Sequence, residues 1–170
     1  MKIFKRLFLV LFLIFMSCSK DSKIKDSDLL NEIILEIEER ESYDEDEYPL
    51  GLFSKEYFKK EAEYAKEQLI RLHKIDVIFL SETESISLEL LKFQLQDAID
   101  YFEFERYLNP LLSDSGFHTN FSFMVRPFQN YEQVKTYLTK LNAIPSRVNQ
   151  FLPLLREGLE KGVSQPSVIF

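Results

Sequence analysis

Apolar residues recur at steps of three and four along most of this chain, and this spacing constrains its fold more than any other feature. Such steps place side chains on one face of an α-helix, whereas a strand needs strict alternation. Five stretches follow the helical pattern: residues 28–41, 54–72, 86–108, 130–141 and 145–161. The chain is therefore expected to be mainly α.

Polar residues mark where several of these helices begin. Ser54 is a candidate N-cap, because its hydroxyl can accept a hydrogen bond from a backbone N–H of the first turn. Ser81 with Glu84, and Asn130 with Gln133, have the spacing of a capping box. The sequence thus predicts helix starts near residues 54, 81 and 130.

Proline and glycine punctuate the last helix. Pro145 suits its first turn, where a proline loses no helical hydrogen bond. Pro153 falls inside the apolar pattern, so it is expected to kink or divide the helix. Lys161 and Gly162 are the expected stop signals.

One stretch departs from the helical spacing. Between residues 117 and 125, phenylalanines and other apolar residues sit at alternate positions. Because a period of two is typical of strands, a short extended segment is predicted near 117–125.

The first 18 residues have the order of a bacterial lipoprotein signal. Lys2, Lys5 and Arg6 form a positive region, residues 7–16 are apolar, and Cys18, the sole cysteine, follows where such signals are cut and acylated. Ten apolar residues span about 15 Å of helix, half of a bilayer core of about 30 Å. We therefore expect a targeting segment and not a transmembrane helix.

This processing divides the chain into a signal peptide (residues 1–17), a tether (18–25) and a folded part (26–170). Lipidation of Cys18 predicts attachment to a membrane in the cell envelope of a Gram-negative bacterium, on the periplasmic side or at the outer-membrane surface. The alternatives are an ordinary secretory signal cut elsewhere and a buried free cysteine. A single cysteine excludes a disulfide within the chain.

Charge bears on the class of partner. Loss of residues 1–17, which carry three positive charges, lowers the formal net charge from -7 to -10. An acidic chain lacks the basic surface that neutralises phosphates. Nucleic acid is therefore not expected as a partner.

Few residues suggest chemistry. His73 and His118 lie far apart and neither belongs to a His-Glu-x-x-His motif, so no zinc site is expected within this chain. Asp97 and Asp100 are either an acid–base pair or, as is far more common, the solvated side of a helix. The acidic stretch at 36–47 lacks the ligand pattern of a calcium loop and is interpreted as a solvated helix end.

A longer pattern of spaced residues runs through the second half of the chain and the end of the helix before it. Its positions are Leu72, Ile75, Asp76, Leu80, Ser81, Tyr107, Leu108, Asn109, Pro110, Leu111, Gly116, Tyr131, Tyr137, Leu138, Leu141, Pro145, Arg156, Glu157, Gly158, Gly162, Pro166 and Val168. This pattern resembles the N-terminal part of the bacterial family called domain of unknown function 885, and the resemblance covers roughly residues 26–170.

This resemblance implies a mostly helical, exported protein similar to zinc metallopeptidases, in which a His-Glu-x-x-His helix lies downstream of the matched part. No position here matches a catalytic residue or a metal ligand. The chain is thus expected to be the N-terminal helical portion of a larger metallopeptidase-like fold, incomplete and inactive alone. Zinc and a peptide substrate are expected for full-length members, with the missing C-terminal portion as a partner of this one.

Two points stay open. Gly158 and Gly162 either let another segment approach closely or simply end the helix. The alternative function is a non-enzymatic helical lipoprotein that binds a partner through an exposed aromatic face, for which residues 117–128 are the candidate.

Overall fold

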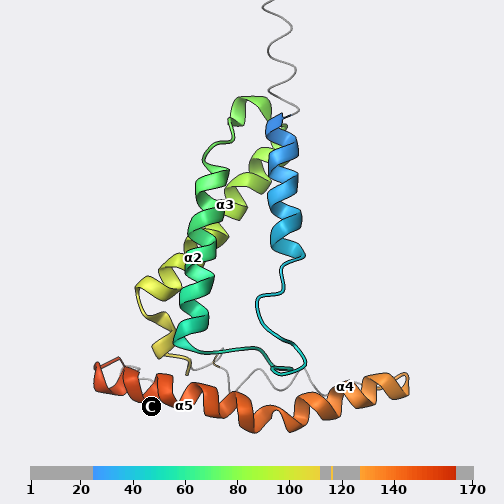
Figure 1. Ribbon diagram of the computed structural model, residues 1–170, viewed down its shortest axis with the longest axis vertical. Helices are drawn as coiled ribbons and strands as arrows, with labels where there is room; N and C mark the ends of the chain where they lie inside the picture. Colours follow the sequence, from blue (N-terminus) through green and yellow to red (C-terminus); the bar gives the residue numbers. More distant parts are fainter. Residues whose placement is uncertain (1–24, 112–115, 117–126, 164–170) are drawn as a thin grey trace, which may run out of the picture. The chain divides into compact units, whose positions relative to one another are not determined.

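The computed structural model describes residues 25–111, 116 and 127–163. In addition to a helix at residues 25–38, it contains α2 (Lys55–Leu72), η1 (Val77–Phe79), α3 (Glu82–Glu103), η2 (Arg106–Leu108), α4 (Tyr131–Asn142) and α5 (Ile144–Glu160), as Figure 1 shows. No strand occurs among these residues, and the mainly α fold class is confirmed. The extended segment expected near 117–125 lies outside the described residues.

Two of the predicted helix starts are built as expected. Ser54 Oγ accepts a hydrogen bond from the backbone N–H of Tyr57 at 3.1 Å, at the start of α2. Before α3, Ser81 N–H donates to Glu84 Oε2 at 2.7 Å and Glu84 N–H donates to Ser81 Oγ at 3.3 Å. This reciprocal pair is the predicted capping box.

The start of α4 differs from the prediction in one bond. Asn130 Oδ1 accepts from Gln133 N–H at 2.9 Å, as predicted. The Gln133 side chain, however, accepts from the backbone N–H of Gln129 at 2.8 Å, one residue before the expected donor. Asn130 therefore caps α4, while Gln133 holds the chain that leads into it.

Two helices differ from what the sequence predicts, α3 in where it ends and α5 in how it accommodates a proline. α3 ends at Glu103 and not near residue 108, because Glu105 adopts a left-handed φ of 52° and η2 follows. Pro153 lies inside α5 without dividing it. Proline removes the donor to the carbonyl of Asn149, and both residues are exposed, so water can satisfy that carbonyl.

The end of α5 follows the predicted stop signals. Gly162 has a φ of 74°. Val163 N–H donates to Gly158 O at 2.8 Å, and Gly162 N–H donates to Leu159 O at 3.1 Å. These two bonds form a Schellman motif, in which a left-handed glycine satisfies the last carbonyls of a helix.

The chain divides into two compact units. Of the described residues, the first unit comprises 25–40 and 65–96, and the second comprises 41–64, 97–111, 116 and 127–163. Within the first, Arg71 Nη2 donates to Glu32 Oε1 at 2.8 Å, and its Nη1 also bonds Glu36, so α2 is tied to the helix at 25–38. The buried apolar side chains of this unit are Leu30, Ile33, Ala65, Leu72, Ile75, Leu88 and Leu95.

The second unit has an aromatic core. Tyr107, on η2, is 1% exposed and is stacked between two rings. Its centroid lies 5.4 Å from that of Phe58 and 5.9 Å from that of Phe102, at interplanar angles of 18° and 16°. Leu108, Phe151 and Leu154 complete the buried cluster, which joins η2 to α5.

Candidate functional site

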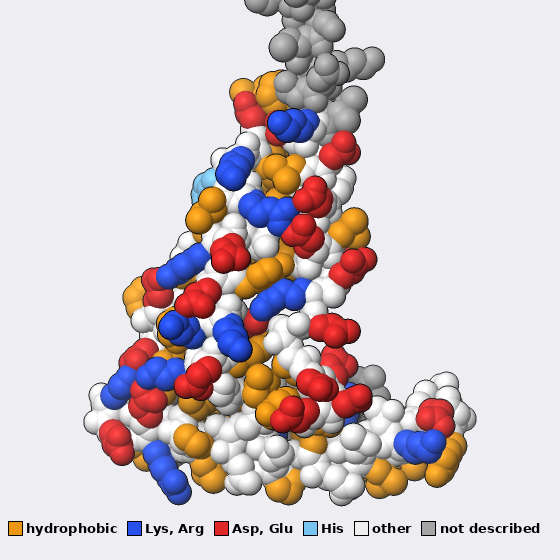
Figure 2. All heavy atoms as spheres, viewed as in Figure 1, with side chains coloured by type: hydrophobic (Ala, Val, Ile, Leu, Met, Phe, Trp, Pro, Cys, Tyr) orange, Lys and Arg blue, Asp and Glu red, His pale blue; other side chains and the backbone are white. Residues whose placement is uncertain are grey.

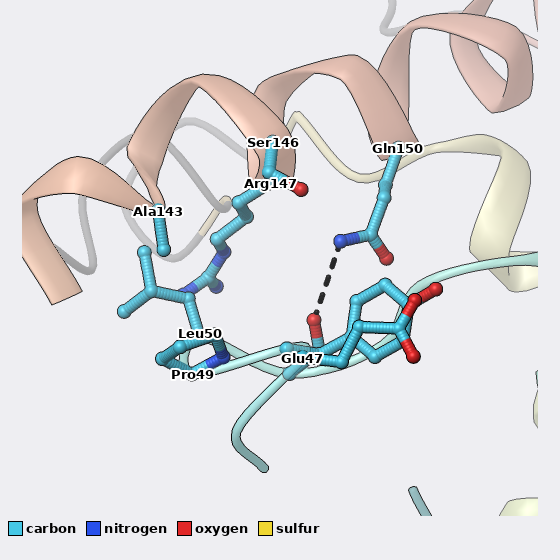
Figure 3. Close-up of a pocket in the computed structure, with 9 residues that line it drawn as sticks. Glu47, Pro49, Leu50, Ala143, Ser146, Arg147 and Gln150 are labelled. Atoms are coloured by element: carbon cyan, nitrogen blue, oxygen red, sulfur yellow. Dashed lines mark hydrogen bonds between the residues drawn. The ribbon is translucent and has the colours of Figure 1, made fainter. Parts of the chain in front are cut away.

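Gln150 holds the loop before α2 against α5. Its Oε1 accepts from the backbone N–H of Phe53 at 2.6 Å, and its Nε2 donates to Gly51 O at 3.4 Å (Figure 3). Gly51 has a φ of 94°, and a Cβ there would lie 2.9 Å from the ring of Phe53. Glycine is therefore required where the loop turns under Gln150.

Arg147 is the most buried cation among the described residues. Its side chain extends from α5 toward the loop (Figure 3), and its guanidinium lies 4.9 Å from the ring centre of Phe53 and 5.9 Å from that of Phe151. Burial lowers the pKa of Arg147. An arginine still stays charged near neutral pH, so the two rings supply cation–π stabilisation for a desolvated charge.

Arg147 and Gln150 line a small pocket together with the loop at residues 47–51, Ala143 and Ser146. Its volume is about 10 Å³. This space holds about one water molecule. The pocket is thus a structural feature of the α5–loop contact and not a substrate cleft.

A cluster of four charged side chains, which we call the α5 clamp, joins α5 to α2 and η2. Glu157 Oε1 accepts from Lys55 Nζ at 2.8 Å and lies 2.9 Å from Lys161 Nζ. Lys161 Nζ also donates to Glu105 Oε1. Each carboxylate therefore faces an ammonium group, and the network links three elements of the second unit.

The clamp favours the charged forms of Lys55, Glu157 and Lys161. Hydrogen bonds from Lys55 and then Lys161 lower the pKa of Glu157. The bond to Glu157 raises the pKa of Lys55, and bonds to Glu105 and Glu157 raise the pKa of Lys161. These shifts move each group away from neutral pH, whereas a general acid or base needs a pKa near the working pH. The clamp is suited to holding helices together.

Gly158 allows the closest backbone approach at this junction. It is buried in α5, and a Cβ there would lie 2.5 Å from the carbonyl oxygen of Leu108. The segment that approaches Gly158 is thus the end of η2. Gly162, by contrast, has open space around its missing Cβ and ends the helix.

The other sequence candidates are not brought together. His73, the residue after α2, has its Nδ1 2.6 Å from Leu69 O in the last turn of that helix. Asp97 Oδ1 accepts from Arg106 Nη2 at 2.6 Å, and its side chain is 57% exposed. Asp97 thus lacks the buried, matched setting that acid–base work needs. His118 lies outside the described residues.

The acidic stretch at 36–47 has local partners. Asp44 Oδ1 accepts from the N–H groups of Asp46 and Glu47 at 2.9 and 3.1 Å, which is an Asx turn. Arg71 bonds to Glu36 and, by this hydrogen bond, lowers its pKa. These contacts agree with the interpretation as a solvated helix end and loop.

The described residues do not fit a zinc site. No group of three or more His, Cys, Asp or Glu side chains in this part of the chain is placed to hold a metal ion. Cys18 and Pro166 lie outside the described residues. None of the helices searched, all within the described ranges, is long and apolar enough to cross a membrane.

Sequence reasoning missed Arg147 and Gln150. A signal was available, because both are polar residues that lie within one turn of Val148 and Phe151 in an apolar helical pattern. Polar side chains at such positions need partners. Their partner, the loop at 51–53, is 97 residues away along the chain. No local pattern in the sequence pairs two segments so far apart.

The part of the chain that contains these contacts is similar to one known protein family. The family model described as "Bacterial protein of unknown function (DUF885)" matches residues 40–170, which include α2, α3, α4 and α5. No curated protein and no solved structure matched this chain. Because the match covers well over half of its length, the chain belongs to the DUF885 family.

Proposed function

We propose that this chain is the helical framework of an exported, lipid-anchored protein of the zinc-peptidase type, and that its own side chains carry structural roles. The observation that supports this most directly is the α5 clamp. Its four charged groups are used in bonds that tie α5 to the start of α2 and to the N-cap of η2.

The other polar groups with catalytic potential are engaged in the same way. The guanidinium of Arg147 lies beside the rings of Phe53 and Phe151, Gln150 is bonded to backbone groups, and His73 is bonded to the last turn of α2. Side chains bound to such partners are held in position within the fold. We therefore assign zinc, the general base and peptide cleavage to residues beyond those described.

The proposed location follows from the N-terminal segment. Cys18, acylated after removal of residues 1–17, would hold the protein at a membrane of the cell envelope through its lipid. The polar tether at 18–25 would separate the lipid from the folded part.

Peptidase assays on the full chain test the framework role. We expect fluorogenic peptides to be cleaved no faster with the chain and zinc than with zinc alone. Zinc-dependent cleavage that is lost in a His118→Ala or His73→Ala variant would overturn the proposal. A sharp thermal transition in the same sample shows that inactivity does not come from misfolding.

A non-enzymatic binding role is the second candidate, and one observation favours it. Phe128 is 46% exposed, although its ring lies 5.0 Å from that of Tyr137. A half-exposed aromatic pair at the start of α4 is suitable for contact with another protein. A Phe128→Ala variant that keeps its thermal transition and still binds every protein that the unchanged chain binds would count against this role.

A further inference from the structure

The turn between α2 and α3 presents apolar side chains to solvent. We call this group the η1 tip: Val77, Ile78 and Phe79. Ile78 is 84% exposed, more than any other large hydrophobic side chain of the described residues, and Val77 is 47% exposed. None of the three residues is buried. The η1 tip is therefore an apolar surface that the contacts of its own unit leave open.

Hydrogen bonds fix the backbone of this turn. Asp76 Oδ1 accepts from Ile78 N–H at 3.0 Å. The carbonyl oxygens of Asp76 and Val77 accept from the N–H groups of Phe79 and Leu80, each at 3.1 Å. A backbone N–H without a partner is costly to place in an apolar medium, and these three groups already have partners. The η1 tip can thus enter apolar surroundings without breaking a backbone hydrogen bond.

The η1 tip lies at the end of the first unit where the helix at 25–38 begins. Ser27 Oγ, in the first turn of that helix, donates to Glu84 Oε1. The same carboxylate caps the start of α3, because its Oε2 accepts from Ser81 N–H at 2.7 Å, two residues after the tip. Figure 1 shows the start of the helix at 25–38, in blue, beside the green turn that carries η1, and Figure 2 shows hydrophobic side chains exposed at this same end. The chain therefore enters the unit next to the η1 tip.

The length of the tether limits how far this end of the unit lies from the proposed lipid anchor. Lys25, the first residue of the helix at 25–38, follows Cys18 by seven positions. Seven residues extend at most about 25 Å. A lipid attached to Cys18 would therefore hold this end of the unit near the membrane surface. Because a short linker raises the effective concentration of a tethered group, even a weak apolar contact is then populated.

Other exposed apolar side chains of the first unit lie further along its helices. Phe93 is 72% exposed, but it follows Glu82, the first residue of α3, by eleven positions, which is about 16 Å of helix. Leu35 is 54% exposed and follows Lys25 by ten positions, which is about 15 Å. The η1 tip, next to the first turn of the helix at 25–38, is better placed for contact with a lipid surface.

We propose that the η1 tip inserts into the surface of the membrane that the lipid anchor reaches, so that its partner is the lipid bilayer itself. Apolar side chains of surface-bound segments enter the boundary between headgroups and acyl chains to a depth of about 5–10 Å. Contact of this kind does not require anionic lipid. The inference rests on the lipid anchor of the proposed function and goes beyond it, because it fixes which end of the first unit faces the membrane.

Site-specific labelling tests the position of the tip. Cys18 is the chain's only cysteine, and acylation blocks its thiol, so Ile78→Cys adds a single reactive thiol to the processed chain. This thiol is labelled with a fluorophore, and the chain is reconstituted into phosphatidylcholine vesicles that carry a nitroxide quencher on the acyl chains. Phe93→Cys, labelled in the same way, is the matched control. We expect quenching to be at least about threefold stronger at residue 78 than at residue 93.

The unchanged chain distinguishes failure of the anchor from failure of the inference. Uptake of the label by the unchanged chain would show that Cys18 is free, so that the anchor of the proposed function fails and this inference falls with it. If the unchanged chain takes up no label, but quenching at residue 78 does not exceed that at residue 93, the anchor stands and this inference alone is overturned.

A second substitution tests whether apolar contact causes the quenching. Val77→Asp, added to the labelled Ile78→Cys chain, is expected to lower the quenching at least about twofold, because a carboxylate beside the label favours water over lipid. Leu35→Asp in the same chain is the matched control, since Leu35 is 54% exposed and Val77 is 47% exposed. Quenching that survives Val77→Asp, or that Leu35→Asp lowers equally, would overturn the proposal. Circular dichroism shows that both variants keep their helix content.

Discussion

Gly158 shows how one missing side chain decides a contact between elements. The carbonyl of Leu108 lies where a Cβ of residue 158 would point, and this atom belongs to the backbone, which cannot rotate away. Glu157, a member of the α5 clamp, is the neighbouring residue in the same helix turn. A change that pushes η2 away from Gly158 would therefore also disturb the clamp.

Gly158→Ala is expected to destabilise the chain by about 1–3 kcal/mol, because the new methyl group must push η2 away from α5. Urea unfolding followed by circular dichroism measures the change. Glu160→Ala, an exposed position in the same helix, is the control and should change stability little. An unchanged midpoint in Gly158→Ala would show that η2 moves without cost.

A titration tests Glu157. Its pKa is lowered from 4.5 by Lys55 and then Lys161, so the folded state favours its ionised form. That stabilisation is complete above the ordinary pKa and is lost as the pH falls through the lowered one.

Thermal unfolding of the unchanged chain and of Glu157→Gln should therefore differ most near pH 7, with the variant less stable. The difference should shrink as the pH falls below about 4.5. Glu160→Gln on the same helix is the matched control. A difference that stays constant down to pH 3 would mean that Glu157 acts by packing and not by charge.

At the scale of the helices, α4 depends on its cap more than α2 or α3 does. It has 12 residues, none of them buried. A helix of about 12 residues is marginal in water without tertiary packing. The bond from Gln133 N–H to Asn130 Oδ1 at 2.9 Å is thus a large part of what defines its start.

Asn130→Ala should lower amide protection across residues 131–142 by about fivefold, since loss of an N-cap costs about 1 kcal/mol. Native-state hydrogen exchange measures this effect. Ser81→Ala removes the cap of α3, whose Leu88, Leu95 and Ile99 are buried, and should leave the protection of that helix interior high. Equal losses in both helices would contradict the argument.

The contrast between local and distant contacts explains what the sequence could predict. Ser54, Ser81 and Gly162 act on residues within a few positions, so their patterns placed helix ends correctly. The end of α3 and the role of Gln150 depend on segments far along the chain. Neither the left-handed Glu105 nor the bond between Gln150 and Phe53 leaves a local pattern that distinguishes it from alternatives.

At the scale of the whole molecule, the proposed location at a membrane rests on Cys18. A Cys18→Ala form is expected to leave the membrane fraction, because the acyl group that would hold it there cannot be attached. Fractionation of cells that express each form measures this. A Ser19→Ala form is the control, and retention of Cys18→Ala in the membrane would rule out lipidation as the means of attachment.

The division into two units has a spectroscopic consequence. The chain has eight tyrosines and no tryptophan, and every tyrosine lies within residues 41–64 or 97–170. Near-ultraviolet signals from tyrosine therefore report on the second unit, whereas far-ultraviolet dichroism reports on the helices of both. If thermal unfolding followed in these two spectral ranges gives transitions that do not coincide, the two units unfold separately. The measurement needs no added label.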